Sequence, residues 1–186
     1  MTTFQVSSVQ EVYSALSKAT GGDIIELAQG TYEGLDIWSG QGFDVEFDGP
    51  VTIRSADPDH PAVIEKLKVT GASNLVFDGL VFDYDADPGK PYYDRPFQIN
   101  DSTNVTVRNS VFDGDLAEGV SEVADGYPTG MGLSVRGGSN ITVENNEFFD
   151  FFNAVGMGGG TDFTVRGNDI HDIRSDGLTM TKVQNV

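Results

Sequence analysis

The residues best suited to chemistry are a histidine and several arginines in the second half of the chain. The segment His171-Asp172-Ile173-Arg174-Ser175-Asp176 brings a potential base, a cation and carboxylates together. A His can act as a general base, and an Arg can neutralise a substrate carboxylate, the two requirements of β-elimination or epimerisation next to a carboxyl group. Arg136 and His171 are therefore the candidate catalytic residues. The alternative is that His171 has only a structural role at a turn.

A second set of polar residues occurs at corresponding positions of a repeated motif. Lys68, Gln98 and Ser134 each stand between apolar residues, so in strands they would point outward from one sheet. Tyr rings can stack on sugars, and basic or amide side chains can bind hydroxyl and carboxylate groups. We therefore expect a glycan-binding groove that includes Lys68, Arg95, Gln98, Asn100, Ser134, Tyr127 and Arg174. The alternative is an ordinary solvated sheet face.

Glycines interrupt this face in one repeat, at Gly156 and at Gly158-Gly159-Gly160. Glycine weakens a strand and often marks the close approach of a ligand or of another backbone segment. Two insertions, 84–95 and 114–130, lengthen successive repeats at the same corner, where they should form neighbouring loops. Either the 114–130 loop folds over the glycines, or a polymer passes there.

An acidic segment in the first insertion has the spacing of a calcium-binding loop. Asp83, Asp85, Asp87 and Asp94 match carboxylate positions of an EF-hand. Pro88 stands where the glycine of an EF-hand is required, and no helices flank the segment, so a true EF-hand is excluded. A less regular calcium site remains one interpretation, and a solvated acidic loop is the other.

These residues belong to a sequence that repeats itself. Similar segments begin at Ser73, Thr103, Ser139 and Thr161, with offsets of 30, 36 and 22 residues. A second motif keeps the same offsets and continues by a further 23, through Leu67-Lys68-Val69, Phe97-Gln98-Ile99, Leu133-Ser134-Val135, Val155-Gly156-Met157 and Leu178-Thr179-Met180. Repeats of this length indicate a solenoid whose units bury their apolar faces only by stacking.

The composition of each repeat selects the kind of solenoid. The repeats alternate apolar and polar residues, are rich in Val, Ile, Thr and Phe, and are punctuated by Gly, Asn and Asp. We predict an all-β fold, a single-stranded right-handed parallel β-helix. Inward columns should comprise Phe82, Phe112, Phe148 and Ile170, and Leu67, Phe97, Leu133, Val155 and Leu178. Outside the core, Asn146 should stack on Asn168, and Asp78, Arg108, Glu144 and Arg166 should form a salt-bridge ladder.

The first residues carry the one predicted helix, 8–20. Val9, Val12, Leu16 and Ala19 follow helical spacing, Ser8 can cap the helix, and Gly21-Gly22 ends it. We expect residues 1–22 to cap the solenoid and residues 23–186 to form its coils, a single domain. The sequence stops inside a predicted strand, so we expect it to be the N-terminal part of a longer solenoid, or to self-associate through its open last coil.

The amino-acid composition restricts the classes of molecule that the chain is expected to bind. The chain has 186 residues, a net charge of −18, 11 basic residues and no cysteine. Nucleic acid is therefore an unexpected partner, and no apolar run is long enough to span a membrane. Acidic, cysteine-free, Gly- and Asp-rich composition suits a secreted, calcium-bearing protein, although no signal peptide is visible.

Two segments carry a resemblance to a known family. GGDIIELAQGTYEG and GPVTIRSADPDHPAVIEKLKVTGASNLVFDGLVFD resemble the N-terminal half of right-handed parallel β-helix (pectate-lyase-like) proteins, nearest to chondroitinase B, alginate lyases and mannuronan C5-epimerase modules. The resemblance implies a lyase or epimerase acting on acidic polysaccharide, often with calcium. The epimerase motif Tyr-Gly-Phe-Asp-Pro-His-Glu is absent here, and the catalytic Lys and Arg of the lyases belong to later coils. The alternative is a non-catalytic glycan-binding or structural β-helix, so the sequence leaves enzymatic activity open.

Overall fold

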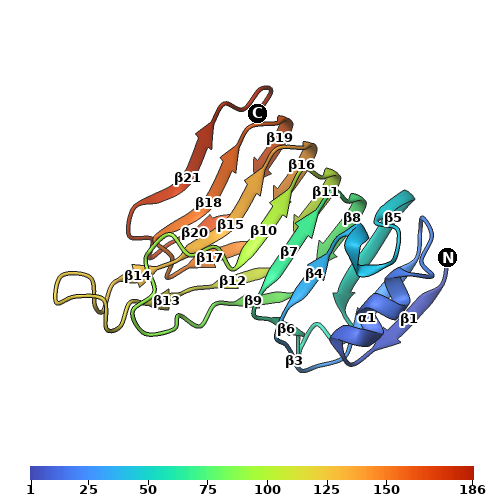
Figure 1. Cartoon of the computed structure of the whole chain (residues 1–186), viewed down its shortest axis with the longest axis horizontal. Helices are drawn as coiled ribbons and strands as arrows, with labels where there is room; N and C mark the ends of the chain where they lie inside the picture. The colour runs from blue at the N-terminus through green and yellow to red at the C-terminus, as the bar shows by residue number, and fades with distance from the viewer.

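The computed structural model describes residues 1–186, which wind into a solenoid of three parallel sheets (Figure 1). Sheet 1 contains β1 (Thr3–Val6), β2 (Ile24–Leu27), β5 (Glu46–Ser55), β8 (Ser73–Asp78), β11 (Thr103–Arg108), β16 (Ser139–Glu144) and β19 (Thr161–Arg166). Sheet 2 contains β4 (Leu35–Ile37), β7 (Leu67–Thr70), β10 (Phe97–Asn100), β15 (Met131–Arg136), β18 (Asn153–Gly158) and β21 (Asp176–Thr181). Sheet 3 contains β3 (Thr31–Tyr32), β6 (Val63–Ile64), β9 (Val81–Asp83), β12 (Val111–Asp113), β17 (Glu147–Phe149) and β20 (Asp169–Ile170).

The predicted register is confirmed residue by residue. Along sheet 3, Phe112 pairs with Phe82 on one side and with Phe148 on the other, and Phe148 pairs with Ile170. Along sheet 2, the column from Leu67 through Phe97, Leu133 and Val155 to Leu178 is continuous. Each repeat is therefore one coil, and residues separated by one repeat lie on adjacent strands.

The core is the inside of the solenoid, where 38 buried apolar residues form one cluster. The Phe112 ring stacks on Phe82 and Phe148 with ring centroids 4.4 and 4.3 Å apart. Burial fades in the outermost coil, where Leu178 is 41% exposed although Leu133 in the same column is 1% exposed. A column of inward-facing side chains therefore stabilises a coil only when another coil covers that coil.

Strands β8, β11 and β16 of sheet 1 each have Asn as their second residue, where the backbone is left-handed. Asn74, Asn104 and Asn140 occupy equivalent positions with φ of 60°, 55° and 53°. Asn tolerates this conformation better than most residues. The side chains also form a ladder, since the Asn104 amide donates to Asn74 at 3.1 Å and the Asn140 amide donates to Asn104 at 2.7 Å. The repeated Asn is therefore a backbone requirement.

Two further predicted columns of paired side chains are present. The Asn146 Nδ2 donates to Asn168 Oδ1 at 3.0 Å and to the Val107 carbonyl at 3.0 Å. In the charged column of sheet 1, Arg108 pairs with Asp78 at 2.8 Å, and Arg166 pairs with Glu144 at 2.6 Å. A third ion pair in the same column joins Arg54 to Glu26, so the charges form separate pairs between neighbouring strands and not one continuous ladder.

The N-terminal cap differs from the prediction. Helix α1 spans only Val9–Leu16, and not 8–20. Ser8 caps it as expected, but the amides of Lys18 and Ala19 both bond to the Ala15 carbonyl, which tightens and ends the last turn. The cap also includes β1, a strand that sequence reading missed, because its four residues become a strand only by pairing with the edge of β2. No helix of the chain is long and apolar enough to cross a membrane.

The two insertions lie against each other at one corner, between sheets 3 and 2. The 114–130 insertion contains the antiparallel hairpin β13 (Asp115–Leu116) and β14 (Pro128–Thr129). The Gly89 amide donates to the Glu118 carbonyl at 2.7 Å, which joins the two loops. Figure 1 shows the hairpin projecting away from the solenoid body. The loops therefore extend one edge of sheet 2 and leave its outer face open.

Candidate functional site

The outer face of sheet 2 carries two rows of side chains that alternate with the core columns. One row runs through successive coils as Asp36, Lys68, Gln98, Ser134, Gly156 and Thr179. The other runs as Thr70, Asn100, Arg136, Gly158 and Thr181. Coils are about 4.8 Å apart along the solenoid axis, so each row presents its groups at this interval.

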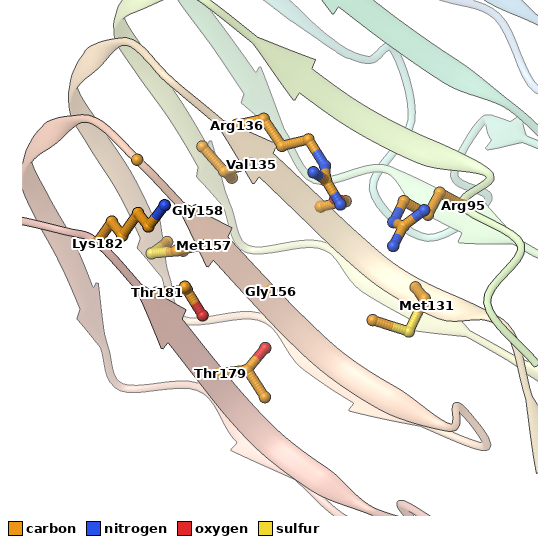
Figure 2. Close-up of a pocket in the computed structure, with 12 residues that line it drawn as sticks. Arg95, Met131, Val135, Arg136, Gly156, Met157, Gly158, Thr179, Thr181 and Lys182 are labelled. Atoms are coloured by element: carbon orange, nitrogen blue, oxygen red, sulfur yellow. The ribbon is translucent and has the colours of Figure 1, made fainter.

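At one end of this face lies the glycine cavity, about 390 Å³ in volume (Figure 2). The polar residues and glycines that line it include Arg95, Ser134, Arg136, Gly156, Gly158 and Lys182. A Cβ added at Gly158 would have no neighbour within 4 Å, and one at Gly156 would meet only the Thr179 hydroxyl, at 3.4 Å. The 114–130 loop does not line the cavity. Of the two alternatives for the glycines, loop cover is therefore wrong, and the bare strand faces open space.

Nearer the N-terminus lies the lysine cavity, about 340 Å³ in volume, whose charged lining residues are Asp36, Lys66, Lys68, Lys90, Asp94 and Arg95. Gln98 also lines this cavity, and its amide donates to the Arg95 carbonyl at 2.9 Å. Arg95 lines both cavities, so the two are contiguous. We call the combined surface the sheet 2 groove.

Charge is distributed very unevenly between the groove and the rest of the molecule. Six of the 11 Lys and Arg residues line the groove, against two of the 29 Asp and Glu residues. Only Lys90 among the six forms an ion pair, with Asp87 and Asp94, and the hydrogen bond that it donates to Asp94 raises its pKa. By contrast, the Arg residues of sheet 1 are paired with carboxylates. A concave surface of unpaired cations attracts anions.

Two groove residues have unsatisfied polar atoms. The Nε of Arg95 and the Oδ1 of Asp36 are buried and have no hydrogen-bond partner. Figure 2 shows the Arg95 and Arg136 guanidinium groups pointing toward one another over sheet 2. An orphaned buried donor is destabilising until a ligand satisfies it, and two guanidinium groups repel each other unless an anion joins them.

The structure separates the two proposed catalytic residues. Arg136 lies in the glycine cavity at the end of β15. His171 follows β20 of sheet 3, where its ring stacks on Phe149 and its nitrogens contact Glu147 at 3.2 Å and Asp172 at 2.8 Å. These carboxylates raise the pKa of His171. His171 does not line the groove, so the geometry gives Arg136 and His171 no common site.

The proposed substrate-binding residues divide into two groups. Five of them lie on or beside the outer face of sheet 2: Lys68, Arg95, Gln98, Asn100 and Ser134. Arg95 lines both cavities, Lys68 and Gln98 line the lysine cavity, and Ser134 lines the glycine cavity. Asn100 lines neither cavity and pairs with Arg136 on the neighbouring strand. Tyr127 and Arg174 lie elsewhere, in a separate cavity beside the hairpin. The reason is the hairpin, which carries Tyr127 outward from the corner.

The proposed calcium ligands do not converge. Asp94 bonds to the Tyr84 hydroxyl at 3.1 Å and to Lys90 at 3.3 Å, and Lys90 also pairs with Asp87. No group of three or more acidic or histidine side chains is arranged to hold a metal ion. Asp83 lies beside Asp113 in sheet 3, and burial, followed by repulsion from nearby aspartates, raises the pKa of both. Calcium binding therefore stays an untested prediction.

Sequence reading missed Lys182, which lines the glycine cavity. It occupies a turn position with φ of 57°, equivalent to Gly71, Asp101, Gly137 and Gly159 in the preceding coils. A lysine in a left-handed position is unusual, and such residues concentrate at functional sites. Its alignment with Gly159, 23 residues earlier, was the signal that could have identified it.

The architecture defines the class of protein: the chain has a right-handed parallel β-helix fold. A family model described as right handed beta helix region matches residues 98–186, slightly less than half of the chain. No curated protein sequence matches the chain.

The solved structures that are similar to the chain include two alginate lyases. One is an alginate lyase from Paenibacillus sp. strain FPU-7, with 18% identity and a TM-score of 0.31, covering 100% of this chain and 99% of that one. Another is the PL6 family alginate lyase AlyGC, with 14% identity and a TM-score of 0.37. The match to AlyGC covers 96% of this chain and 40% of that protein, so the chain spans about two fifths of its length.

Proposed function

We propose that the chain binds an acidic, uronate-containing polysaccharide along the sheet 2 groove. The observation that carries this proposal is the concentration of six cations and only two carboxylates in the groove of a chain with net charge −18. An anionic ligand is attracted by these cations and would satisfy the buried Arg95 donor. Secretion belongs to the same proposal, because such polymers lie outside cells.

The extended shape of the groove favours a polymer over a small anion. Its residues come from successive coils between β4 and β21, along the solenoid axis. Cations alternate there with hydroxyl and amide groups, including Gln98, Ser134 and Thr179, which suit sugar hydroxyls. The bare strand at Gly156 and Gly158 leaves room for a chain to lie against the sheet.

A second candidate is catalysis by β-elimination or C5 epimerisation on the same polymer. Both reactions remove the proton next to a carboxylate, which a cation must neutralise. Arg136 is placed for this role in the glycine cavity, and Lys182 lines the same cavity. We propose Lys182 as the base in place of His171, because Lys182 lines the same cavity as Arg136 and His171 lies in the turn after β20. A binding module without activity is the alternative.

Binding is tested by affinity electrophoresis of the intact chain through gels that contain alginate, chondroitin sulfate or polygalacturonate, with dextran as a neutral control. We expect at least one acidic polymer, and not dextran, to retard migration. Variant Lys68→Ala/Arg136→Ala should abolish the retardation, while Arg108→Ala/Arg166→Ala, which removes two cations from sheet 1, should preserve it. Equal behaviour of the two double variants would contradict the proposal.

Catalysis is tested on whichever polymer binds. A lyase would generate unsaturated uronate products, which are detected by their ultraviolet absorbance. An epimerase would change the uronate composition of the polymer, which is measured by NMR. Arg136→Ala and Lys182→Ala should each abolish the activity. Binding without either product would establish the non-catalytic alternative for this chain.

A further inference from the structure

The geometry points to a second ligand site, for a neutral sugar, in the cavity between the 114–130 hairpin and the turns of the last coils. We call it the hairpin cavity, and its volume is about 690 Å³. The hairpin contributes Leu116, Val123, Tyr127 and Pro128, and the turns contribute Asp150, Asp172, Ile173 and Arg174. This volume lies within the range of small-molecule sites.

The exposed tyrosines of the protein lie on the two loops that meet at this corner. Tyr92, Tyr93 and Tyr127 are each more than half exposed. The buried tyrosines have structural partners, since the Tyr32 hydroxyl donates to two carbonyls and the Tyr84 hydroxyl donates to Asp94. The Tyr127 hydroxyl has no hydrogen-bond partner within the chain, although its ring borders the cavity. Exposed rings beside a cavity are suited to contact with a ligand.

Arg174 is held in the cavity by aromatic rings. Its guanidinium lies 5.2 Å from the centroid of the Tyr127 ring and 5.6 Å from that of Phe152. Arg54, Arg108 and Arg166 form ion pairs, but Arg174 forms none, although Asp150 and Asp172 line the same cavity. Its hydrogen-bond donors are therefore available to a ligand.

Backbone hydrogen bonds fix the two walls of the cavity. The Arg174 amide donates to the Phe151 carbonyl at 3.0 Å, and the Phe152 amide donates to the Gly130 carbonyl at 2.9 Å. In the hairpin, the Ala117 amide donates to the Tyr127 carbonyl at 2.8 Å. The ring, the guanidinium and the carboxylates are thus placed before a ligand arrives, which lowers the entropic cost of binding.

The lining selects the chemistry of the ligand. A purely apolar ligand would desolvate Asp150 and Arg174, which have no hydrogen-bonded or ion-pair partner for their side chains, and this is costly. An anionic ligand would face two carboxylates against one guanidinium. A neutral polyhydroxylated ring suits this lining, because its apolar face packs against the wall formed by Leu116, Tyr127 and Pro128, and its hydroxyls donate to the carboxylates and accept from Arg174. The site thus differs in specificity from the cationic sheet 2 groove.

The test is calorimetric titration of the intact chain with three neutral oligosaccharides, cellohexaose, β-1,4-mannohexaose and β-1,4-xylohexaose, and with an alginate hexasaccharide. We expect at least one neutral oligosaccharide to bind saturably. Tyr127→Ala and Arg174→Gln should each weaken that binding at least tenfold. Tyr93→Ala, which removes an exposed ring outside the cavity, should leave it unchanged, and unaltered thermal unfolding would verify that each variant is folded.

The groove and the hairpin cavity are distinguished by cross-testing. Arg136→Ala should weaken binding of the alginate hexasaccharide and leave the neutral ligand unaffected, while Tyr127→Ala should do the reverse. Absence of saturable binding for all three neutral ligands up to about 10 mM, well above the range of useful affinities, would overturn the inference. So would unchanged neutral binding in Tyr127→Ala, or loss of only alginate binding in that variant. Failure of every acidic polymer to bind, alginate included, would contradict the groove alone.

Discussion

At the scale of single residues, the cations of the sheet 2 groove differ from those of sheet 1 in their partners. Arg108 and Arg166 neutralise carboxylates on neighbouring strands of sheet 1. Arg136 and Lys182 line a cavity and have no acidic partner. The ion pairs of Arg108 and Arg166 were predicted from sequence, because alternating signs in one column already indicated charge pairing between strands.

Arg136→Ala should weaken binding of acidic polysaccharide about tenfold or more. The reason is that hydrogen bonds to charged groups contribute about 1.5–3 kcal/mol, and about 1.4 kcal/mol corresponds to a factor of ten. Titration calorimetry with the bound polymer measures the change. The matched control is Arg166→Ala, which also removes an exposed arginine, from sheet 1, and should change affinity less than twofold. Comparable losses in both variants would show that only net charge matters.

Gly158→Val tests whether the ligand lies against the bare strand. The added side chain meets no neighbouring atom, and the position lies in a strand, where valine is favoured by up to ~1 kcal/mol. The variant should therefore unfold at the same or a slightly higher denaturant concentration, yet bind acidic polymer several-fold more weakly. Retained affinity together with retained stability would place the ligand elsewhere.

His171 should make stability depend on pH. Hydrogen bonds to Asp172 and Glu147 raise its pKa above the ordinary value of 6.5. A raised pKa means that the folded state binds the proton more tightly than the unfolded state does, so the stabilisation is complete below pH 6.5 and is lost as pH rises through the folded-state pKa. His171→Gln should therefore lower the denaturation midpoint more at pH 5.5 than at pH 9. Equal changes at both pH values would contradict this.

At the scale of elements, the sequence repeats strand by strand, but stability comes from columns of side chains that stack across neighbouring strands. A strand of three to six residues has no independent stability, and its inward residues become core only when the next coil covers them. This explains why residues with the same motif position differ in burial. Leu133 lies between two covered coils, while Leu178 lies in the outermost coil.

The same substitution should therefore have different effects in the same column. Leu133→Ala removes a fully buried side chain and should lower the free energy of unfolding by about 2–5 kcal/mol. Leu178→Ala, at a position that is 41% exposed, should cost less than about 1 kcal/mol. Urea denaturation of both variants measures the difference. Similar losses would show that Leu178 is covered in solution, as expected if the outermost coil associates with another chain.

At the scale of the whole molecule, the solenoid segregates charge by face. Sheet 1 displays paired charges, the corner between sheets 3 and 2 displays acidic loops, and sheet 2 displays unpaired cations. This arrangement allows a chain with net charge −18 to attract an anionic polymer at one face and repel it from the others. The polymer should thereby be confined to the groove.

Affinity for acidic polysaccharide should consequently fall as salt is added. At 0.1 M salt the screening length is about 10 Å, shorter than the solenoid, so local attraction in the groove outweighs distant repulsion. We expect affinity to decrease at least tenfold between about 0.05 and 0.5 M sodium chloride, measured by titration calorimetry. Affinity that rises with salt would mean that whole-molecule repulsion dominates, and the groove would not be the binding surface.

Most of the fold could be predicted from sequence, whereas the site could be predicted only in part. The register of Phe112, Leu133 and Asn146 followed from offsets, because stacking places equivalent residues on adjacent strands. Strand β1 and the end of α1 were not predicted, because pairing with β2 and the tightening of the last helical turn decide them. Lys182 escaped notice because its importance comes from a turn conformation that composition does not display.

The sequence alone determined which residues share a column and which point inward, since a two-residue alternation within strands and a constant offset between coils are both visible in one dimension. Only the tertiary structure decided that Arg136 and His171 lie apart, that the hairpin carries Tyr127 away from the groove, and that Arg95 joins the two cavities. These facts depend on the directions that loops take and on contacts between different sheets. Repeat spacing fixes positions along the solenoid axis, but the path of an insertion and the pairing of charges are set by contacts between residues distant in sequence.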